Sequence, residues 1–241
     1  MANIPDHIRI KLQHAEDFPP KIMELCLKEL TYSGKRQRRR ISVYLGEMAQ
    51  ALKSALNYAM WDFAEKNLNS LLSEEECERV RWSHDFPIEK SKDEFERSKV
   101  RMLRHIASNF RGVYQFLERA QPYHGENNFL LHLRTLSNDA THTIPIEIEP
   151  IHANDIVFGC GLKPRILGNK VIVPGHGGAP LTVYSSTPCF VRELNVFVSE
   201  EKRWVLILID LGGQTRPSLI PFIEKASYKV NELISGFYAL W

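Results

Sequence analysis

The sequence predicts an α+β protein in which an N-terminal helical bundle precedes a small, mostly antiparallel sheet and a C-terminal helix. Apolar residues recur at three- and four-residue steps up to about residue 143, a spacing that is typical of helices. From residue 144 the period changes to two, and short apolar runs alternate with Gly and Pro. We therefore expect two regions, 1–145 and 146–241, and we expect them to pack as one unit.

The composition of the chain is that of an ordinary globular protein. Its 241 residues are 44% hydrophobic and 25% charged, with a net charge of +2 that neither requires nor excludes a nucleic-acid partner. The four cysteines form no Cys-x-x-Cys pair, and no apolar run reaches the roughly 20 residues of a membrane helix. We expect a cytoplasmic protein with reduced thiols that does not associate with membranes. The nine histidines show no metal-ligand spacing, so neither a metal nor a cofactor is expected.

The first long helix is expected from about Ile41 to Leu68, where six apolar residues form one stripe. A shorter helix is expected at about 21–30. The acidic run Glu74–Glu76 is interpreted as part of a polar connection.

Two further helices follow in the first region. Ser91–Glu94 has the pattern of a capping box, and the helix that it opens should continue to Gln121. The next helix should begin after Asn127 or Asn128, since either is a good N-cap, and it must end before Pro145.

The second region should form short strands, with a last helix near Ser218 in which Pro221 fits the first turn. Ser199–Arg203 reads as a hairpin loop between two of the strands. The expected strands lie at about 144–149, 156–158, 170–173, 181–184, 190–198 and 204–211.

Arg134, Asn138 and His142 follow one another at four-residue steps, so a helix would place them on one face. Arginine and asparagine can hold a phosphate, and histidine can move a proton, which together suffice to cut RNA without a metal. The same three residues also fit a solvated helix face, with a histidine favoured by the helix dipole in the last turn. Both interpretations stay open at this point.

Four short motifs carry a resemblance to a known family. They are Ala55–Tyr58 (Ala-Leu-Asn-Tyr), Asp85–Ile88 (Asp-Phe-Pro-Ile), Gln121–Tyr123 (Gln-Pro-Tyr) and Leu136–His142 (Leu-Ser-Asn-x-x-x-His). In this order they resemble a family of uncharacterised bacterial proteins, and residues 41–145 resemble the HEPN (higher eukaryotes and prokaryotes nucleotide-binding) domains.

The resemblance implies an N-terminal HEPN-like bundle, RNA as a partner, a homodimer and metal-independent RNA cleavage. HEPN ribonucleases share an Arg-Asn-x-x-x-His motif, which Asn138 and His142 match, whereas Ser137 stands where the arginine is expected. His142 would be the general base and Asn138 the orienting group. Arg134, one turn earlier, would replace the missing phosphate clamp. The acidic residue that the bacterial family carries after Ala-Leu is Asn57 here.

One dense basic run offers a second contact for nucleic acid. It comprises Lys35, Arg36, Arg38, Arg39 and Arg40. These cations could neutralise phosphates, or they could form a solvated lead-in to the first long helix.

The sequence therefore predicts a nucleic-acid-directed protein, with a metal-independent endoribonuclease of defence or toxin type as its leading form. The alternative is a non-catalytic binding or assembly module that keeps the HEPN-like scaffold.

Overall fold

The structure, a computed structural model, describes residues 4–32, 35–81, 85–98, 100–141, 147–152, 165–167, 170–174, 180–184, 189–191, 196–198, 204–210 and 218–241. Of the residues whose side chains it describes, 79% are helical, and no sheet forms among them. The α+β fold class predicted from the sequence is therefore wrong for these residues, because they are helical and contain no sheet.

Helices occupy more of the chain than the sequence predicted. They are α1 (Asp6–Glu16), α2 (Phe18–Tyr32), α3 (Lys35–Phe63), α4 (Glu74–Arg81), α5 (Lys92–Glu96), α6 (Arg101–Asn109), α7 (Arg111–Arg119), α8 (Phe129–Thr141) and α9 (Leu219–Tyr238). A π-helical turn, Ala64–Leu68, continues α3, and a 3₁₀ turn, Pro122–His124, precedes α8.

Three helical segments had been missed. The helix α1 was not predicted, although Ile8, Leu12 and Ala15 form a buried stripe on it. The basic run had been placed ahead of the first long helix, but α3 begins at Lys35 and includes it. The acidic run lies in α4, where the Ser73 hydroxyl accepts from the Glu76 amide and the Glu76 carboxylate accepts from the Ser73 amide. This reciprocal capping stabilises a helix that is too polar to show an apolar stripe.

The chain groups into two compact units, each made of segments that are distant in sequence. One unit comprises 1–19, 45–144 and 224–241, and the other comprises 20–44 and 145–223. The chain passes from one unit to the other at 19/20, 44/45, 144/145 and 223/224. The division into regions 1–145 and 146–241 stays a prediction.

Phe63, at the end of α3, is the centre of an aromatic core in the first unit. Its ring centroid lies 5.1 Å from that of Phe110, 5.6 Å from that of Phe237 and 5.5 Å from that of Trp241. The predicted apolar stripe of α3 is buried. It consists of Leu45, Met48, Leu52, Leu56, Ala59 and Phe63, and Met60 is buried as well.

A polar contact accompanies this aromatic core. The Tyr238 hydroxyl donates to the buried Asp62 carboxylate at 2.7 Å, and the Lys66 ammonium lies 2.9 Å from the same oxygen. Burial and the neighbouring carboxylate raise the pKa of Tyr238, so its hydroxyl stays protonated as a donor. The contact fixes the last turns of α9 to the end of α3.

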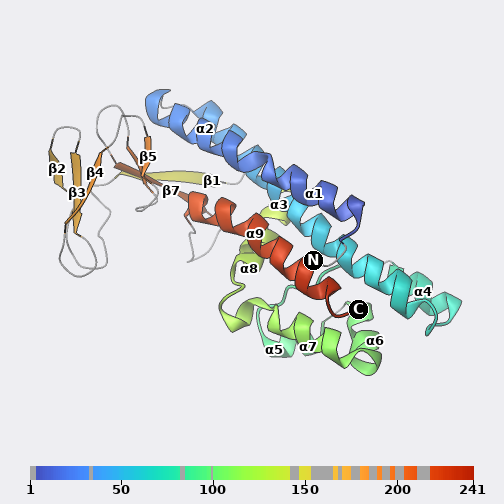
Figure 1. Cartoon of the computed structure of the whole chain (residues 1–241). Coiled ribbons are helices and arrows are strands. Elements are labelled where there is room, and N and C mark those ends of the chain that lie inside the picture. Colours follow the sequence, from blue (N-terminus) through green and yellow to red (C-terminus); the bar gives the residue numbers. More distant parts are fainter. Residues whose placement is uncertain are drawn as a thin grey trace. The chain divides into compact units, whose positions relative to one another are not determined.

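The single helix predicted from Ser91 to Gln121 is divided into α5, α6 and α7, which lie next to one another (Figure 1). The chain becomes extended at Val100 (φ −67°, ψ 98°), and it leaves helical geometry again at Phe110 (φ −133°, ψ 65°). The break at Phe110 lets its ring reach Phe63, so a tertiary contact overrides the continuous apolar stripe.

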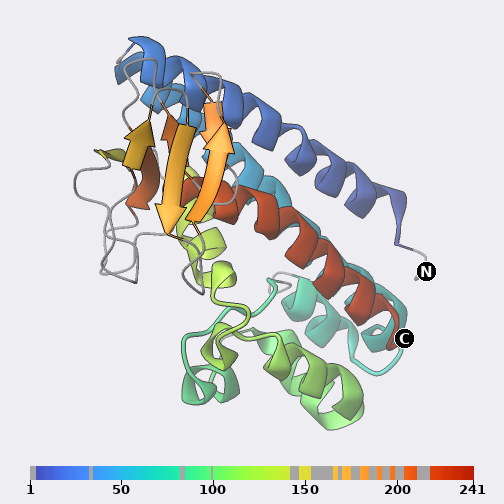
Figure 2. The ribbon, with the colours of Figure 1, turned by 60° about the vertical axis from the view of Figure 1, so that its left-hand side comes forward.

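The strands belong to the second unit, where the structure gives their backbone pairing. They are β1 (Glu147–His152), β2 (Arg165–Leu167), β3 (Lys170–Pro174), β4 (Pro180–Tyr184), β5 (Cys189–Val191), β6 (Val196–Val198) and β7 (Trp204–Asp210). They form two antiparallel sheets, with orders β1-β7-β6-β5 and β2-β3-β4, in place of the one sheet predicted. Figure 2 shows the strands as arrows.

The strand expected at 190–198 is a hairpin, because β5 and β6 pair with each other, Phe190 opposite Phe197. The pairing of β6 with β7 agrees with the hairpin expected around Ser199–Arg203. The strand expected at 156–158 lies outside the described residues.

Among the helices that the structure describes, none has the length and apolarity needed to cross a bilayer.

Candidate functional site

Arg134 lies on α8 and is engaged within the protein. Its guanidinium donates to the carbonyl oxygen of Ile88, and its Nη1 lies 3.7 Å from Oε2 of Glu89. Only 31% of its side chain is exposed. In this arrangement Arg134 anchors the chain around Ile88 and does not extend into solvent as a phosphate clamp would.

The segment that Arg134 holds, Asp85–Lys90, lies outside helices and strands, and we call it the strap. Phe86, Pro87 and Ile88 are buried in it, so its backbone polar groups need partners inside the protein. Asn57 of α3 supplies two contacts: its Oδ1 accepts from the Phe86 amide at 3.0 Å, and its Nδ2 donates to the Asp85 carboxylate at 2.6 Å.

Gln121 supplies the other contacts to the strap. Its side chain is fully buried, with Nε2 donating to the carbonyls of Pro87 (3.0 Å) and Leu117 (2.8 Å). Its Oε1 accepts from the Glu89 amide at 2.9 Å. All of the amide's polar atoms are therefore bonded, as a buried amide requires.

Three of the four motifs that carried the family resemblance meet at this strap. Asn57 comes from the first, Asp85–Ile88 is the second, and Gln121 begins the third. Arg134 completes the set from α8, two residues before the fourth motif. The structure thus gives these motifs a structural role, since together they fasten the strap to α3, to α8 and to the segment that follows α7.

Asn138 is exposed on α8 and faces a cation that the sequence analysis did not single out. Its Oδ1 accepts from Nζ of Lys53, on α3, at 3.0 Å. The two residues are 85 positions apart in the chain, so no spacing rule could have paired them. The only local signal was a lysine beside the apolar stripe of α3, between Leu52 and Leu56.

The other residues of the Asn-x-x-x-His motif are in different surroundings. Ser137, in place of the expected arginine, is buried at 5% exposure, beside the buried Leu133 and Leu136 of the same helix. His142 lies outside the described residues. The proposed grouping of Arg134, Asn138 and His142 around one phosphate therefore stays a prediction.

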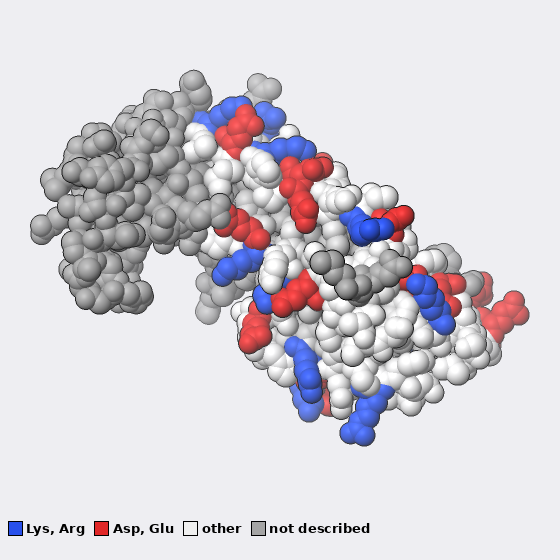
Figure 3. All heavy atoms as spheres, in the orientation of Figure 1, with Lys and Arg blue, Asp and Glu red and all other residues white. Residues whose placement is uncertain are grey.

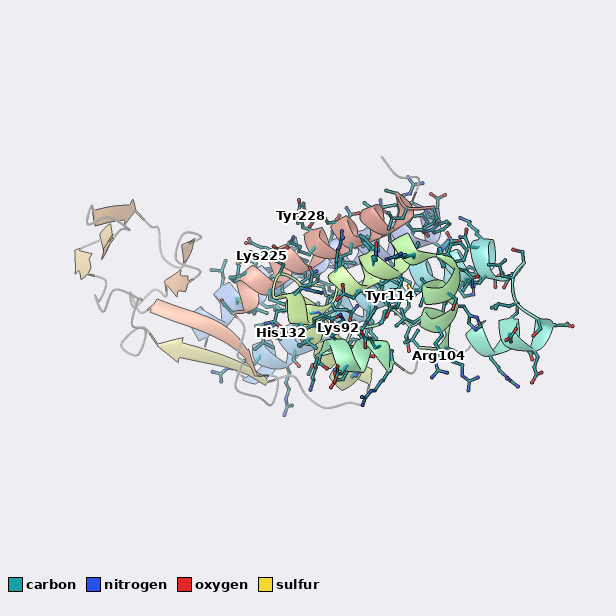
Figure 4. All side chains as sticks on the ribbon, turned by 90° about the horizontal axis from the view of Figure 1, so that it is seen from below. Lys92, Arg104, Tyr114, His132, Lys225 and Tyr228 are labelled. Atoms are coloured by element: carbon teal, nitrogen blue, oxygen red, sulfur yellow. The ribbon has the colours of Figure 1, made fainter. Side chains whose placement is uncertain are left out.

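One histidine of α8, His132, had not been considered, and Figure 4 labels it. It is half-buried, and burial lowers its pKa from the ordinary value of 6.5. It is thus mostly neutral at pH 7, and a neutral imidazole can accept a proton.

The basic run is part of α3 and belongs to the second unit. The side chains of Lys35 and Arg36 are outside the description, whereas Arg39 and Arg40 are exposed and Arg38 is half-buried. In the described part of the chain, a pocket of about 310 Å³ is lined by Arg39, Arg40, Val43 and Tyr44.

Charge on the described surface is otherwise mixed. Acidic and basic side chains alternate over the face in Figure 3, without a broad field of one sign. A pocket of about 380 Å³ beside the strap is lined by Glu89, Asp93, Glu94, Arg97, Ser98 and Val100. The described residues contain no cluster of three side chains that could hold a metal ion.

Glu118 joins two neighbours at the end of α7. The Tyr123 hydroxyl donates to Glu118 Oε1 at 3.1 Å, and His124 Nε2 lies 3.0 Å from the same oxygen. Burial and the bond to Glu118 raise the pKa of Tyr123, so this hydroxyl acts as a donor. The cluster fixes the turn that leads into α8.

Comparison with family models, with curated proteins and with solved structures yielded no match to this chain. The HEPN resemblance therefore rests on the short motifs alone.

Proposed function

We propose that this protein is a cytoplasmic, nucleic-acid-directed binding protein with a HEPN-like helical scaffold and RNA as its partner. The observation that carries the proposal is the exposed pair of Lys53 and Asn138, joined at 3.0 Å on neighbouring helices of the first unit. This pair places a positive charge next to the asparagine of the Asn-x-x-x-His motif.

The chemistry of the pair suits a phosphate. The Lys53 ammonium is a compact point charge with three donors, and it can bond a phosphate oxygen while it keeps its contact with Asn138. The Nδ2 group of Asn138 can donate to a second oxygen of the same phosphate. Lys53 thus supplies the positive charge that the expected arginine would carry and that Ser137 cannot.

Binding without catalysis is favoured by the position of Arg134. A phosphate clamp must present its guanidinium to the ligand, whereas Arg134 bonds Ile88 and lies beside Glu89. Moving it would leave a carbonyl of the buried strap without its donor.

Metal-independent cleavage is the second candidate, and the Lys53–Asn138 pair favours it as well. In that reaction the 2′-oxygen attacks the adjacent phosphorus, the bond from phosphorus to the 5′-oxygen breaks, and His142 takes the proton from the 2′-hydroxyl. The leaving 5′-oxygen takes a proton from an acid or from water. Lys53 would replace Arg134 in stabilising the charged transition state.

The test is to measure RNA affinity and RNA cleavage on the same preparations. Fluorescence anisotropy with a labelled RNA, at low salt and with EDTA, gives the Kd of the wild type, Lys53→Gln, Asn138→Ala and His142→Ala. Arg104→Gln is the matched control, because Arg104 is an exposed cation on α6 (Figure 4). We expect Lys53→Gln to weaken binding about fivefold or more, and Arg104→Gln to have little effect.

The outcomes separate the two candidates. Binding by the wild type without cleavage supports the binding protein, whereas cleavage that His142→Ala abolishes supports the ribonuclease. A wild type that does not bind RNA at low salt contradicts both. The predicted homodimer is tested separately, by light scattering of the purified chain.

A further inference from the structure

The pocket on α3 in the second unit combines an apolar, an aromatic and two basic side chains. Val43 is 56% exposed, and Tyr44 beside it is half-buried. Arg39 and Arg40 line the same pocket of about 310 Å³.

The charges at this pocket favour an anion. Arg39 and Arg40 are both exposed, and three further cations, at 35, 36 and 38, precede them on the same helix. Among the described residues, the Glu24 carboxylate interacts with Arg40, but the main partner of Glu24 is Lys28. The lining described for the pocket includes no acidic residue.

The positions of these residues on the helix bring charge and ring together. Arg40 and Tyr44 are four residues apart, so they lie on one face, one turn from each other. An arginine guanidinium binds phosphate through two parallel bonds, and an aromatic ring stacks on a nucleobase. A nucleotide offers both a phosphate and a flat ring within the length of one helical turn.

We infer that this pocket binds one nucleotide unit of single-stranded nucleic acid, with the base against Tyr44 and Val43 and the phosphate on Arg39 and Arg40. Paired bases in a duplex are stacked on their neighbours and cannot lie on Tyr44, so the pocket selects single strands. The inference rests on the proposed function and adds to it a strand preference and a second contact, separate from Lys53.

The experiment compares Kd values for a ten-nucleotide oligo(U) RNA, an abasic strand of the same length and charge, and an RNA duplex. The variants are Tyr44→Leu, Tyr44→Phe and the double variant Arg39→Gln/Arg40→Gln. Tyr58→Leu is the control, because Tyr58 is a 40% exposed tyrosine elsewhere on α3. Thermal unfolding confirms that each variant is folded.

We expect Tyr44→Leu to weaken oligo(U) binding about fivefold or more and to leave the duplex unchanged, with Tyr44→Phe and Tyr58→Leu close to the wild type. The wild type should bind the abasic strand more weakly than oligo(U), a readout that needs no variant. The double variant Arg39→Gln/Arg40→Gln should weaken the binding of oligo(U) and of the abasic strand.

Two results overturn the inference without affecting the proposed function. One is an oligo(U) affinity that Tyr44→Leu leaves unchanged, and the other is equal wild-type affinity for oligo(U) and for the abasic strand. In both cases the RNA-binding function itself stands if the wild type binds RNA and Lys53→Gln weakens that binding. A wild type with no RNA affinity overturns the function together with the inference.

Discussion

At the scale of single residues, side-chain amides and one guanidinium replace the secondary-structure bonds that the strap lacks. The strap lies outside helices and strands and is partly buried, so its amides and carbonyls would otherwise be unsatisfied. Asn57, Gln121 and Arg134 each bond at least one of these backbone groups. Arg134, one of the residues that first suggested chemistry, therefore contributes to folding.

Gln121→Ala should lower the free energy of unfolding by about 1 to 3 kcal/mol, because it leaves the Glu89 amide and the Pro87 carbonyl without their partner. Denaturant unfolding measures the change. Gln115→Ala, an exposed glutamine of α7, is the control and should change stability by less than about 0.5 kcal/mol. Equal effects of the two substitutions would contradict the role of Gln121.

Asn57→Asp should destabilise the protein at neutral pH, because it replaces the donor to Asp85 by a second carboxylate at hydrogen-bond distance. We expect a loss of about 1 kcal/mol after allowance for solvent screening. Protonation of either carboxylate removes the repulsion. The deficit is therefore full while both carboxylates are charged, and it shrinks at acidic pH.

The control for Asn57→Asp is the exchanged pair Asn57→Asp/Asp85→Asn, which restores one donor and one carboxylate. Thermal melts at pH 7 and pH 4 should show rescue by the exchange at pH 7 and a smaller difference at pH 4. A deficit that is the same at both pH values and persists in the exchanged pair would exclude this explanation.

At the scale of elements, local signals fixed some helix ends, and tertiary contacts fixed others. Ser91 caps α5 as predicted, with its hydroxyl accepting from the Glu94 amide, because an N-cap needs only residues three positions apart. The helix α8 likewise begins at Phe129, directly after the predicted caps. The break at Phe110 was missed, because its reason is a contact with Phe63 on another helix.

The packing of α9 on α7 leads to a prediction about two glycines. A Cβ at Gly236 would lie 2.9 Å from the Phe116 ring, whereas a Cβ at Gly112 would meet nothing within 4 Å. Gly236→Ala should therefore destabilise the protein by about 1 kcal/mol despite the better helix propensity of alanine. Gly112→Ala should stabilise it by about 0.5 to 1 kcal/mol.

Denaturant unfolding of the two glycine variants provides the measurement. In a Phe116→Leu background, Gly236→Ala should lose its penalty, because the shorter side chain makes room for the added methyl group. A penalty that persists there would show that the ring is not its cause.

At the scale of the whole molecule, the small net charge of +2 limits how RNA can be bound. Mixed charges over the described face leave a few defined cations to contact phosphates (Figure 3). The affinity should then depend on salt only through contacts such as those of Lys53, Arg39 and Arg40.

For oligo(U), the logarithm of the binding constant should fall with the logarithm of the salt concentration, and each phosphate contact of a single strand should add about 0.7 to the magnitude of the slope. Lys53→Gln should reduce the magnitude of the slope by about 0.7. Anisotropy titrations between 50 and 200 mM salt, about the usual range for such slopes, measure it. A slope that Lys53→Gln leaves unaltered would remove Lys53 from the interface.

The sequence by itself determined the helices with long apolar stripes, in particular most of α3, α8 and α9, and the cap at Ser91, because periodicity and capping act within a few residues. The tertiary structure decided which groups these helices bond and which segments pack together. The Arg134 guanidinium donates to the carbonyl of Ile88, 46 positions away, and Lys53 donates to Asn138, 85 positions away. Segments 20–44 and 224–241 each group with segments that are distant in the sequence. Such partners depend on how the helices pack, and a hydrogen bond between distant residues leaves no periodic trace in the sequence. The two described residues of α8 that suggested catalysis thus have different roles. Arg134 anchors the strap, and Asn138 is exposed and bonds Lys53.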